Sequence, residues 1–308
     1  NQEIKKSSLE VASYGRAIAD AKSTSLIAVC FGLEDSSQLA AYGVDKVFVI
    51  PTAGDIHFNA ERYSSTLVAI AKAEAVDLLI VGGSANGRFI GPLIAIKFEA
   101  SYFSNVIRLP TAYDPVEVKR SCFTNKAFNH SISKKDKVII SLSSNSFGLH
   151  EKAAEAAPVE GTYSPSSFSL EVVTVEQSSA KVSIADADIV VSGGRGLKGP
   201  ENWHLIEELA NVLGAATACS KPVSDMGWRP HSEHVGQTGK PVASNLYIAI
   251  GVSGAIQHLA GINSSKVKVV INSDPEAPFF KAADYGVVGD AFEVVPELTC
   301  KLKALKEA

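Results

Sequence analysis

The sequence VVSGGRGLKGPEN (residues 190–202) joins a run of apolar β-branched residues to a glycine-rich segment. Three later segments also combine apolar runs with Gly, Ser, Thr, Asn or His: SEHVGQTGK (232–240), IAIGVSGAIQHLAG (248–261), and INSDPEAP (271–278) running on to ADYGVVGDAF (283–292). In an open α/β sheet, ligands bind at the carboxyl ends of the parallel strands. Four such strand ends in one half of the chain predict a large, extended cofactor rather than a small substrate.

The first half of the chain alternates between helical and strand patterns, which is typical of βαβ units in a parallel sheet. We expect helices at 9–21, 36–42, 60–75 and 89–100, and strands at 25–31, 46–50 and 77–82. Shorter runs at 104–109, 117–122, 137–142 and 170–175 predict an antiparallel or mixed edge on the same sheet. Residues 143–169 are rich in Ser, Ala, Pro and Gly, and they predict a long surface segment.

The second half repeats the alternation. We expect strands at 188–192, 215–219, 246–251, 267–271 and 285–289, and helices at 200–213, 253–261 and 294–305. At 308 residues the chain is longer than the ~250–300 residues at which a single core usually divides. We therefore predict a two-domain α/β protein. Residues 1–185 form a three-layer α/β/α domain with a mostly parallel sheet, and residues 186–308 form a Rossmann-like doubly wound domain.

Charge and composition restrict the partners. The net charge of −4 and the isoelectric point near 6.0 argue against nucleic acid or an anionic membrane. No apolar run approaches the ~20 residues of a membrane-spanning helix, so no membrane insertion is expected. The polar residues 1–8 predict no signal peptide. The chain has four cysteines, at positions too widely spaced for a zinc site or a disulfide framework: Cys30, Cys122, Cys219 and Cys300. We expect reduced thiols in the protein core. The expected location is the cytoplasm, or the mitochondrial matrix of a eukaryote.

Residues 194–199 (GRGLKG) match the G-x-G-x-x-G pattern between a predicted strand and a predicted helix. Glycines in this pattern allow a tight turn and let backbone N–H groups approach a pyrophosphate. However, Ser220 and Lys221 follow the next predicted strand, where a nicotinamide-binding domain has an acidic residue. The pattern thus argues against NAD bound in the usual way, and a glycine-rich turn without a ligand is the alternative.

Two other patterns are weaker. Residues 236–240 (GQTGK) resemble part of a P-loop, but Pro241 replaces the Mg²⁺-binding hydroxyl, which argues against an NTPase. His231 and His234 flank Glu233 and could be part of a metal site. Because no third ligand with suitable spacing is present, surface histidines are the preferred interpretation.

Several polar residues follow the later strands, and each has two interpretations. Ser253 could contact a phosphate or cap a helix. His258 could contact a ligand or be an interior histidine. Asn272 and Asp290 could bind ribose or adenine, or could serve the turns in which they lie. No G-x-S-x-G segment is present, so a serine hydrolase is not expected.

Three segments together closely resemble the α subunit of the electron transfer flavoproteins: VVSGGRGLKGPENW, HVGQTGKPVASNLYIAIGVSGAIQHLAGI and INSDPEAPFFKAADYGVVGDAFEVVPEL. In the first half the resemblance is weaker and rests on element order and on DLLIVGGSANGRFIGPLIAIKF. It implies one FAD in the C-terminal domain and a heterodimer with a β subunit that holds AMP. The implied function is an electron carrier of fatty-acid and amino-acid oxidation. Such a carrier accepts electrons from acyl-CoA and other flavin dehydrogenases and passes them to a membrane quinone oxidoreductase.

The resemblance also implies which residues bind FAD. Arg195 would contact the diphosphate or the ring, the Thr238 hydroxyl would lie near N5, and His258 would lie near the pyrimidine carbonyl. Asn272, together with its neighbours at the last strand, would hold the adenosine. The complete implied set is Arg195, Gly196, Ser220, Lys221, Val235, Gly236, Gln237, Thr238, Gly239, Ser253, Gly254, Ala255, Ile256, Gln257, His258, Asn272, Asp290 and Ala291.

One departure concerns Lys221, which stands where the family commonly has arginine. Lysine is a mobile point charge that cannot stack on a ring as a planar guanidinium does. We expect Lys221, Arg195 and His258 to place positive potential or hydrogen-bond donors around the flavin. The alternatives are an NAD-dependent oxidoreductase, a subunit of an electron-bifurcating flavoprotein, and a nucleotide-binding subunit without redox chemistry. No catalytic residue or metal ligand is expected.

Overall fold

The computed structural model describes residues 4–51, 57–123, 125–154, 157–162, 170–174, 184 and 187–307. The chain divides into two compact units. Unit 1 comprises Asn1–Cys122 and Ala127–Gln177, and unit 2 comprises Phe123–Lys126 and Ser178–Ala308. The proposed domain boundary at 185/186 remains a prediction, because residues 175–183, 185 and 186 lie outside the described residues.

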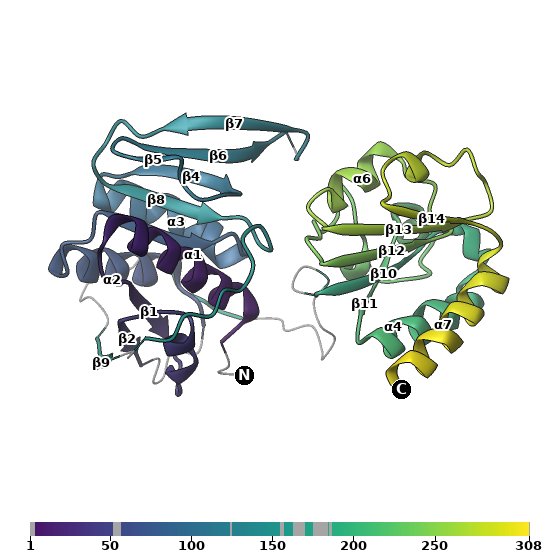
Figure 1. Ribbon diagram of the computed structural model, residues 1–308, viewed down its shortest axis with the longest axis horizontal. Coiled ribbons are helices and arrows are strands. Elements are labelled where there is room, and N and C mark those ends of the chain that lie inside the picture. Colours follow the sequence, from purple (N-terminus) through teal and green to yellow (C-terminus); the bar gives the residue numbers. More distant parts are fainter. Residues whose placement is uncertain are drawn as a thin grey trace. The chain divides into compact units, whose positions relative to one another are not determined.

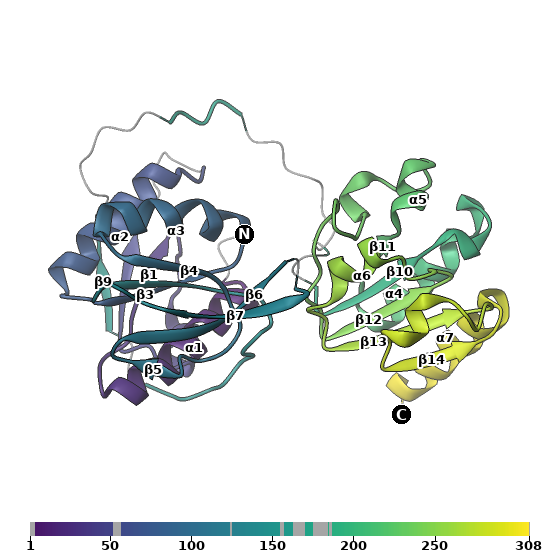
Figure 2. The ribbon, with the colours of Figure 1, turned by 90° about the horizontal axis from the view of Figure 1, so that it is seen from above.

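Unit 1 has three layers, with strands between helices (Figure 2). Its helices are α1 (Lys6–Lys22), η1 (Ser37–Ala41), α2 (Ala60–Ala73) and α3 (Ala85–Phe98). Its strands are β1 (Ile27–Phe31), β2 (Lys46–Ile50), β3 (Leu78–Gly82), β4 (Ser101–Val106), β5 (Ala112–Tyr113), β6 (Val116–Cys122), β7 (Ala127–Ile132), β8 (Val138–Leu142) and β9 (Ala157–Glu160). Figure 1 shows α1 on one face of the strands, with α2 and α3 on the other.

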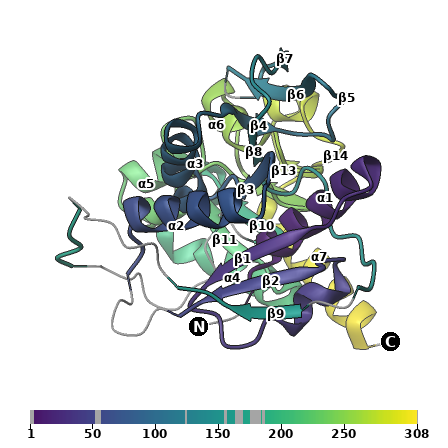
Figure 3. The same cartoon turned by 90° about the vertical axis from the view of Figure 1, so that its left-hand side faces the viewer.

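The strands of unit 1 form two sheets rather than the single sheet predicted. One has the order β1-β2-β9 and is parallel; the other has the order β3-β8-β4-β6-β5, with β7 paired to β6 (Figure 3). In the larger sheet β3, β8 and β4 are parallel, and β5, β6 and β7 form the antiparallel edge that was predicted. Residues of β1 and β3 line a cavity of about 490 Å³, and the two strands are not paired.

Several local predictions for unit 1 were wrong. The helix expected at 36–42 is the short 3₁₀ helix η1, and the segment 143–169 contains β9. Residues 170–174 form no strand, and residue 175 lies outside the described part. Strand β7 was missed because most of its side chains are exposed, so its sequence AFNHSI has no apolar alternation. Helix α3 begins before residue 89 because the Ser84 hydroxyl accepts a hydrogen bond from the Gly87 N–H at 3.2 Å.

Unit 2 is a five-stranded parallel sheet with helices on both faces (Figure 1). Its strands are β10 (Ile189–Gly193), β11 (Ala216–Cys219), β12 (Leu246–Ile250), β13 (Val267–Asn272) and β14 (Tyr285–Val288). Its helices are η2 (Arg195–Leu197), η3 (Pro200–Trp203), α4 (His204–Leu213), α5 (Lys221–Asp225), η4 (His231–Glu233), α6 (Ile256–Ile262), η5 (Pro278–Lys281) and α7 (Ala291–Glu307). The doubly wound prediction is confirmed.

The strand order is β11-β10-β12-β13-β14. In chain order this is 2-1-3-4-5, the flavodoxin-like arrangement, in which the topological switch point lies between the first and third strands. Here these strands are β10 and β12, which pair from Ile189 with Leu246 to Gly193 with Ile250. The fold therefore places the preferred ligand crevice at the carboxyl ends of β10 and β12.

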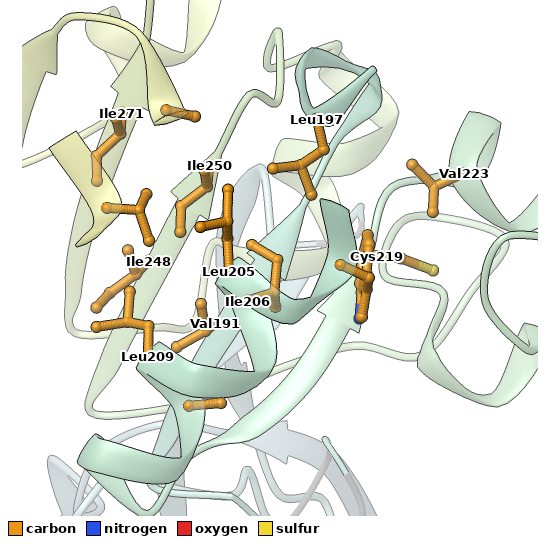
Figure 4. Packing of buried hydrophobic residues seen from close by; sticks show 14 residues of the cluster. Val191, Leu197, Leu205, Ile206, Leu209, Cys219, Val223, Ile248, Ile250 and Ile271 are labelled. Atoms are coloured by element: carbon orange, nitrogen blue, oxygen red, sulfur yellow. The ribbon is translucent and has the colours of Figure 1, made fainter. Parts of the chain in front are cut away.

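Alternating residues of the central strands fill a core on each face. Val191 of β10 and Ile248 of β12 pack with Ile206 and Leu209 of α4 on one face, as Figure 4 shows. Tyr247 belongs to the core on the opposite face. This double burial explains why the strands are continuous apolar runs.

The ends of the unit 2 helices differ from the predictions. The helix expected at 200–213 divides into η3 and α4, and the helix expected from residue 253 begins at Ile256. Helix α7 begins three residues early because an Asp290 carboxylate oxygen accepts from the Phe292 N–H at 3.0 Å. Helix α5 was not predicted.

All four cysteines are free. Cys219 is buried, and burial raises its thiol pKa to about 12; burial likewise raises the pKa of Cys30 to about 11. The prediction of a core thiol was wrong for Cys300, which is exposed on α7.

Within the described residues, no helix is long and apolar enough to cross a membrane.

Candidate functional site

The segments singled out in the sequence meet at one edge of the unit 2 sheet. Ser220 and Lys221 follow β11, residues 194–199 follow β10, and residues 251–258 follow β12. Asn272 is the last residue of β13, and Asp290 follows β14. Five neighbouring strands span four spacings of about 4.8 Å, or about 19 Å. This row is long enough for an extended ligand.

Residues 235–239 lie between the end of β11 and helix α6. The Val235 N–H donates to the Cys219 carbonyl at 3.0 Å, and the Gln237 N–H donates to the Gln257 carbonyl at 2.7 Å. A Cβ atom on Gly261 of α6 would lie only 2.7 Å from the Gly236 Cα atom. The backbone of this loop is therefore held on both sides at the carboxyl edge.

The glycines of the GRGLKG segment allow a close approach of two backbone loops. A Cβ on Gly194 would overlap the Gly251 carbonyl oxygen, and one on Gly196 would lie 2.6 Å from the Gly251 Cα. The Gly194 N–H donates to Ile250, the Gly196 N–H to Gly251, and those of 197–199 to carbonyls within the same turn. These glycines let the loops after β10 and β12 touch. The N–H groups of Gly194, Gly196 and Gly199 already donate within the chain.

The segment after β12 contains backbone N–H groups that are free to bind a ligand. The loop ends at the Ala255 N-cap of α6, where no side chain accepts a hydrogen bond. No N–H group of Ser253, Gly254, Ala255, Ile256 or Gln257 donates to a residue that the structure describes. Clusters of free backbone N–H groups are typical of anion-binding sites. Ser253 is not the N-cap that the sequence suggested; it lies in this loop.

Unpaired side chains lie beside these donors. Arg195 and Lys221 are exposed, and no hydrogen bond or ion pair joins either cation to a described residue. The Thr238 and Ser253 hydroxyls are likewise without a hydrogen-bond partner in the described part of the chain. These four side chains, each on a different segment of unit 2, are thus available to a ligand.

His258 is buried behind this edge. Its Nε2 lies 2.9 Å from the Tyr247 hydroxyl, and its buried Nδ1 has no hydrogen bond of normal geometry to a described residue, although the Val235 backbone is near enough to act against the fall in the ring's pKa. Burial lowers the pKa of His258 to about 4, with a smaller contribution from nearby His234, so the ring is neutral at pH 7. With the proton on Nδ1, Tyr247 can donate to Nε2, and Nδ1 remains a donor. His258 therefore supplies a hydrogen bond rather than a positive charge.

Asn272, Asp290 and Ala291 have local roles. The Asn272 amide donates to the Val252 carbonyl at 3.1 Å, and its oxygen accepts from the Asp274 N–H at 3.0 Å. Asp290 caps α7 and lies 3.7 Å from the Lys198 ammonium, while Ala291 is buried in the core. The turn and capping roles considered for Asn272 and Asp290 are thus present.

An ion pair next to residues 235–239 was not predicted. Arg229 makes a two-pronged ion pair with Glu233, and both side chains are largely buried. His234 is also buried, so the surface interpretation was wrong for this histidine, although His231 is exposed. Among the residues that the structure describes, no group of three His, Cys, Asp or Glu side chains could hold a metal ion. The one sequence signal for this ion pair is the i,i+4 spacing of Arg229 and Glu233.

Comparison with known families identifies both units. Residues 1–164 match the electron transfer flavoprotein domain, and residues 183–263 match the electron transfer flavoprotein FAD-binding domain. The chain belongs to the electron transfer flavoprotein family. The resemblance in the sequence, the flavoprotein class and the electron-transfer role that it implied are thereby confirmed.

Similar curated proteins are named as α subunits of electron transfer flavoproteins. The Bacillus subtilis protein is 36% identical over 309 residues, covering 98% of this chain and 94% of its own length. The Paracoccus denitrificans protein is 38% identical over 271 residues, covering 87% and 85%. A protein of Cryptococcus neoformans, named as a probable mitochondrial α subunit, is 37% identical over 274 residues, covering 85% and 77%.

Proposed function

We propose that this electron transfer flavoprotein chain is an α subunit that holds one FAD at the carboxyl edge of unit 2. The observation that carries this proposal is the set of free N–H groups at 253–257, which lie on the sheet edge that also bears Arg195 and Lys221. A diphosphate needs such donors and cations. When bound, the flavin supplies the redox chemistry, and the protein sets its orientation and electrostatic surroundings.

The proposed contacts follow the row of strand ends. Asn272, Asp290 and Ala291 hold the adenosine, residues 253–257 with Arg195 and Gly196 hold the diphosphate, and Ser220, Lys221 and residues 235–239 line the ring. The Thr238 hydroxyl and the buried His258 Nδ1 are donors without described partners, which suits the polar edge of an isoalloxazine. Buried polar atoms are normally satisfied, so a ligand atom at Nδ1 would remove an energetic cost.

Ile256→Pro is expected to weaken FAD binding about 10- to 100-fold, because one charge-assisted hydrogen bond contributes about 1.5–3 kcal/mol. Ile256 is the first residue of α6, a position that tolerates proline, and Ala255 before it has the extended conformation that proline requires. Titrating the apoprotein with FAD measures the change. Ile256→Ala keeps the N–H and removes the same exposed side chain. Equal affinities for the two variants would exclude this N–H from the site.

Lys221→Met is expected to lower the midpoint potential of the bound flavin, because a cation beside the ring favours the added negative charge of reduction. Lys221→Arg should keep the potential near that of the native protein. A reductive titration of the loaded protein against dyes of known potential measures both. If Lys221→Met leaves the potential unchanged, Lys221 does not act on the ring.

We further propose a heterodimer with a β subunit that holds AMP. In this role the chain accepts electrons from acyl-CoA and other flavin dehydrogenases and passes them to a membrane quinone oxidoreductase in fatty-acid and amino-acid oxidation. The proposed location is the cytoplasm, or the mitochondrial matrix in a eukaryote. The names of the Bacillus subtilis and Paracoccus denitrificans relatives support an α subunit.

Gentle purification followed by a cofactor count tests the proposal. One FAD and one AMP per pair of chains is the expected result, whereas a second flavin in the partner would indicate electron bifurcation. A colourless protein that binds NADH would instead support an NAD-dependent oxidoreductase. Ser220 and Lys221 at the end of β11 argue against that outcome, because no acidic residue is there for a ribose.

A further inference from the structure

An ion pair holds the loop that carries residues 235–239. Arg229 Nε and Nη2 donate to the two carboxylate oxygens of Glu233 at 2.8 and 2.7 Å, and Arg229 Nη1 donates to Glu207 of α4 at 3.2 Å. The guanidinium also lies over the Trp203 ring, 5.3 Å from its centre. Arg229 therefore links the loop to α4 and to η3, the segment that precedes α4.

Burial distinguishes this pair from an ordinary surface ion pair. The Arg229 and Glu233 side chains are 17% and 11% exposed. For comparison, Lys301 and Glu297 on α7 have the same i,i+4 spacing and the same 2.7 Å separation, but are 74% and 68% exposed. A buried ion pair adds little net stability, since desolvation offsets most of the attraction, but its fork geometry fixes orientation.

The loop that the pair anchors leads directly into the proposed flavin contacts. Glu233 is followed by the buried His234, whose carbonyl accepts from the Lys240 N–H at 2.9 Å and so closes the loop. Val235 then bonds to Cys219 at the end of β11. Glu233 lies near enough to raise the pKa of the Cys219 thiol, although burial is the main cause. The carboxylate therefore lies beneath the part of the edge where Ser220 and Lys221 are found.

We propose that the Arg229–Glu233 pair is a positioning device for residues 234–239, and that Arg229 compensates the charge of the Glu233 carboxylate. The proposal rests on the FAD site proposed above. The pair does not touch the cofactor. It acts by holding the loop whose Thr238 hydroxyl faces the ring, and by compensating the Glu233 carboxylate that the loop buries.

The double variant Arg229→Met/Glu233→Leu separates positioning from stability. It replaces a buried ion pair by apolar side chains, an exchange that usually preserves stability. We expect thermal unfolding close to that of the native protein but FAD affinity reduced about tenfold or more, since the loop loses its directional hold. Glu297→Gln removes the exposed pair as a matched control and should change neither quantity. Native FAD affinity in the double variant would overturn the proposal.

The single variants carry an electrostatic signature that a purely structural role would not produce. Arg229→Met leaves Glu233 as a buried anion and should lower the flavin potential, whereas Glu233→Gln removes that anion, leaves Arg229 paired with Glu207 alone and should raise the potential. Both should weaken FAD binding. Potential shifts of the same sign, or none, would overturn the proposal. If the native protein itself binds no flavin, the proposed function fails first, and the two failures are thereby distinguished.

Discussion

Gly194→Ala is expected to destabilise unit 2 by about 4 kcal/mol or more and to abolish flavin binding, since clashes in the backbone are among the most damaging substitutions. The new Cβ would overlap the Gly251 carbonyl oxygen and lie 2.6 Å from its carbonyl carbon and 2.8 Å from the Val252 Cα. These are all backbone atoms, so no side-chain rotation relieves the clash. The loops after β10 and β12 must separate, and they form the switch point of the sheet. Urea unfolding and the flavin content of the purified protein measure the two effects.

Gly214→Ala is the matched control. Gly214 follows α4 with φ of +65°, and nothing lies within 4 Å of a Cβ built there. The substitution therefore adds backbone strain without a clash and should cost about 1 kcal/mol while the flavin is retained. If Gly194→Ala is as stable and as yellow as Gly214→Ala, the two loops do not touch as described.

The central strands were predictable because both of their faces are covered. Residues 46–50 (KVFVI) match β2 residue for residue, and the strands of unit 2 lie within one residue of prediction at each end. A strand buried on both faces is a continuous apolar run, which can be recognised without knowing which strands pair with it. Helix ends were less predictable, because they depend on single capping contacts such as those of Ser84 and Asp290.

The glycine motif shows the limit of sequence patterns. The spacing of Gly194 and Gly196 correctly indicates close backbone approach, but it does not say what approaches. The partner is Gly251, which is distant in sequence and adjacent only through the pairing of β10 with β12. The free N–H groups lie instead at 253–257, where no glycine pattern identifies them. The same limit applies to His234, because nothing in its local sequence indicates that its side chain is buried.

The free energy of unfolding of the apoprotein is expected to fall by about 3 kcal/mol between pH 6.5 and pH 4 because of His258 alone. Burial depresses its pKa from 6.5 to about 4, a difference of about 2.5 units at ~1.36 kcal/mol each. In this interval the unfolded chain binds a proton that the folded chain does not, so stability decreases as the pH falls. The stability that the neutral His258 ring contributes is fully present above pH 6.5 and is lost below the pKa of the folded state. Burial also lowers the pKa of His234, which adds a contribution of the same sign.

Comparing variants isolates this contribution from those of the carboxylates, which remain the same in each protein. Urea unfolding at several pH values between 4 and 7 should give His258→Gln a loss smaller by about 3 kcal/mol than that of the native chain. Tyr247→Phe removes the 2.9 Å contact to Nε2 but leaves the ring buried. Since burial is the main cause of the depressed pKa, this variant should keep most of the native pH dependence. A native slope in His258→Gln would mean that the ring is protonated as easily in the folded state as in the unfolded chain, and that it can place a positive charge at the flavin after all.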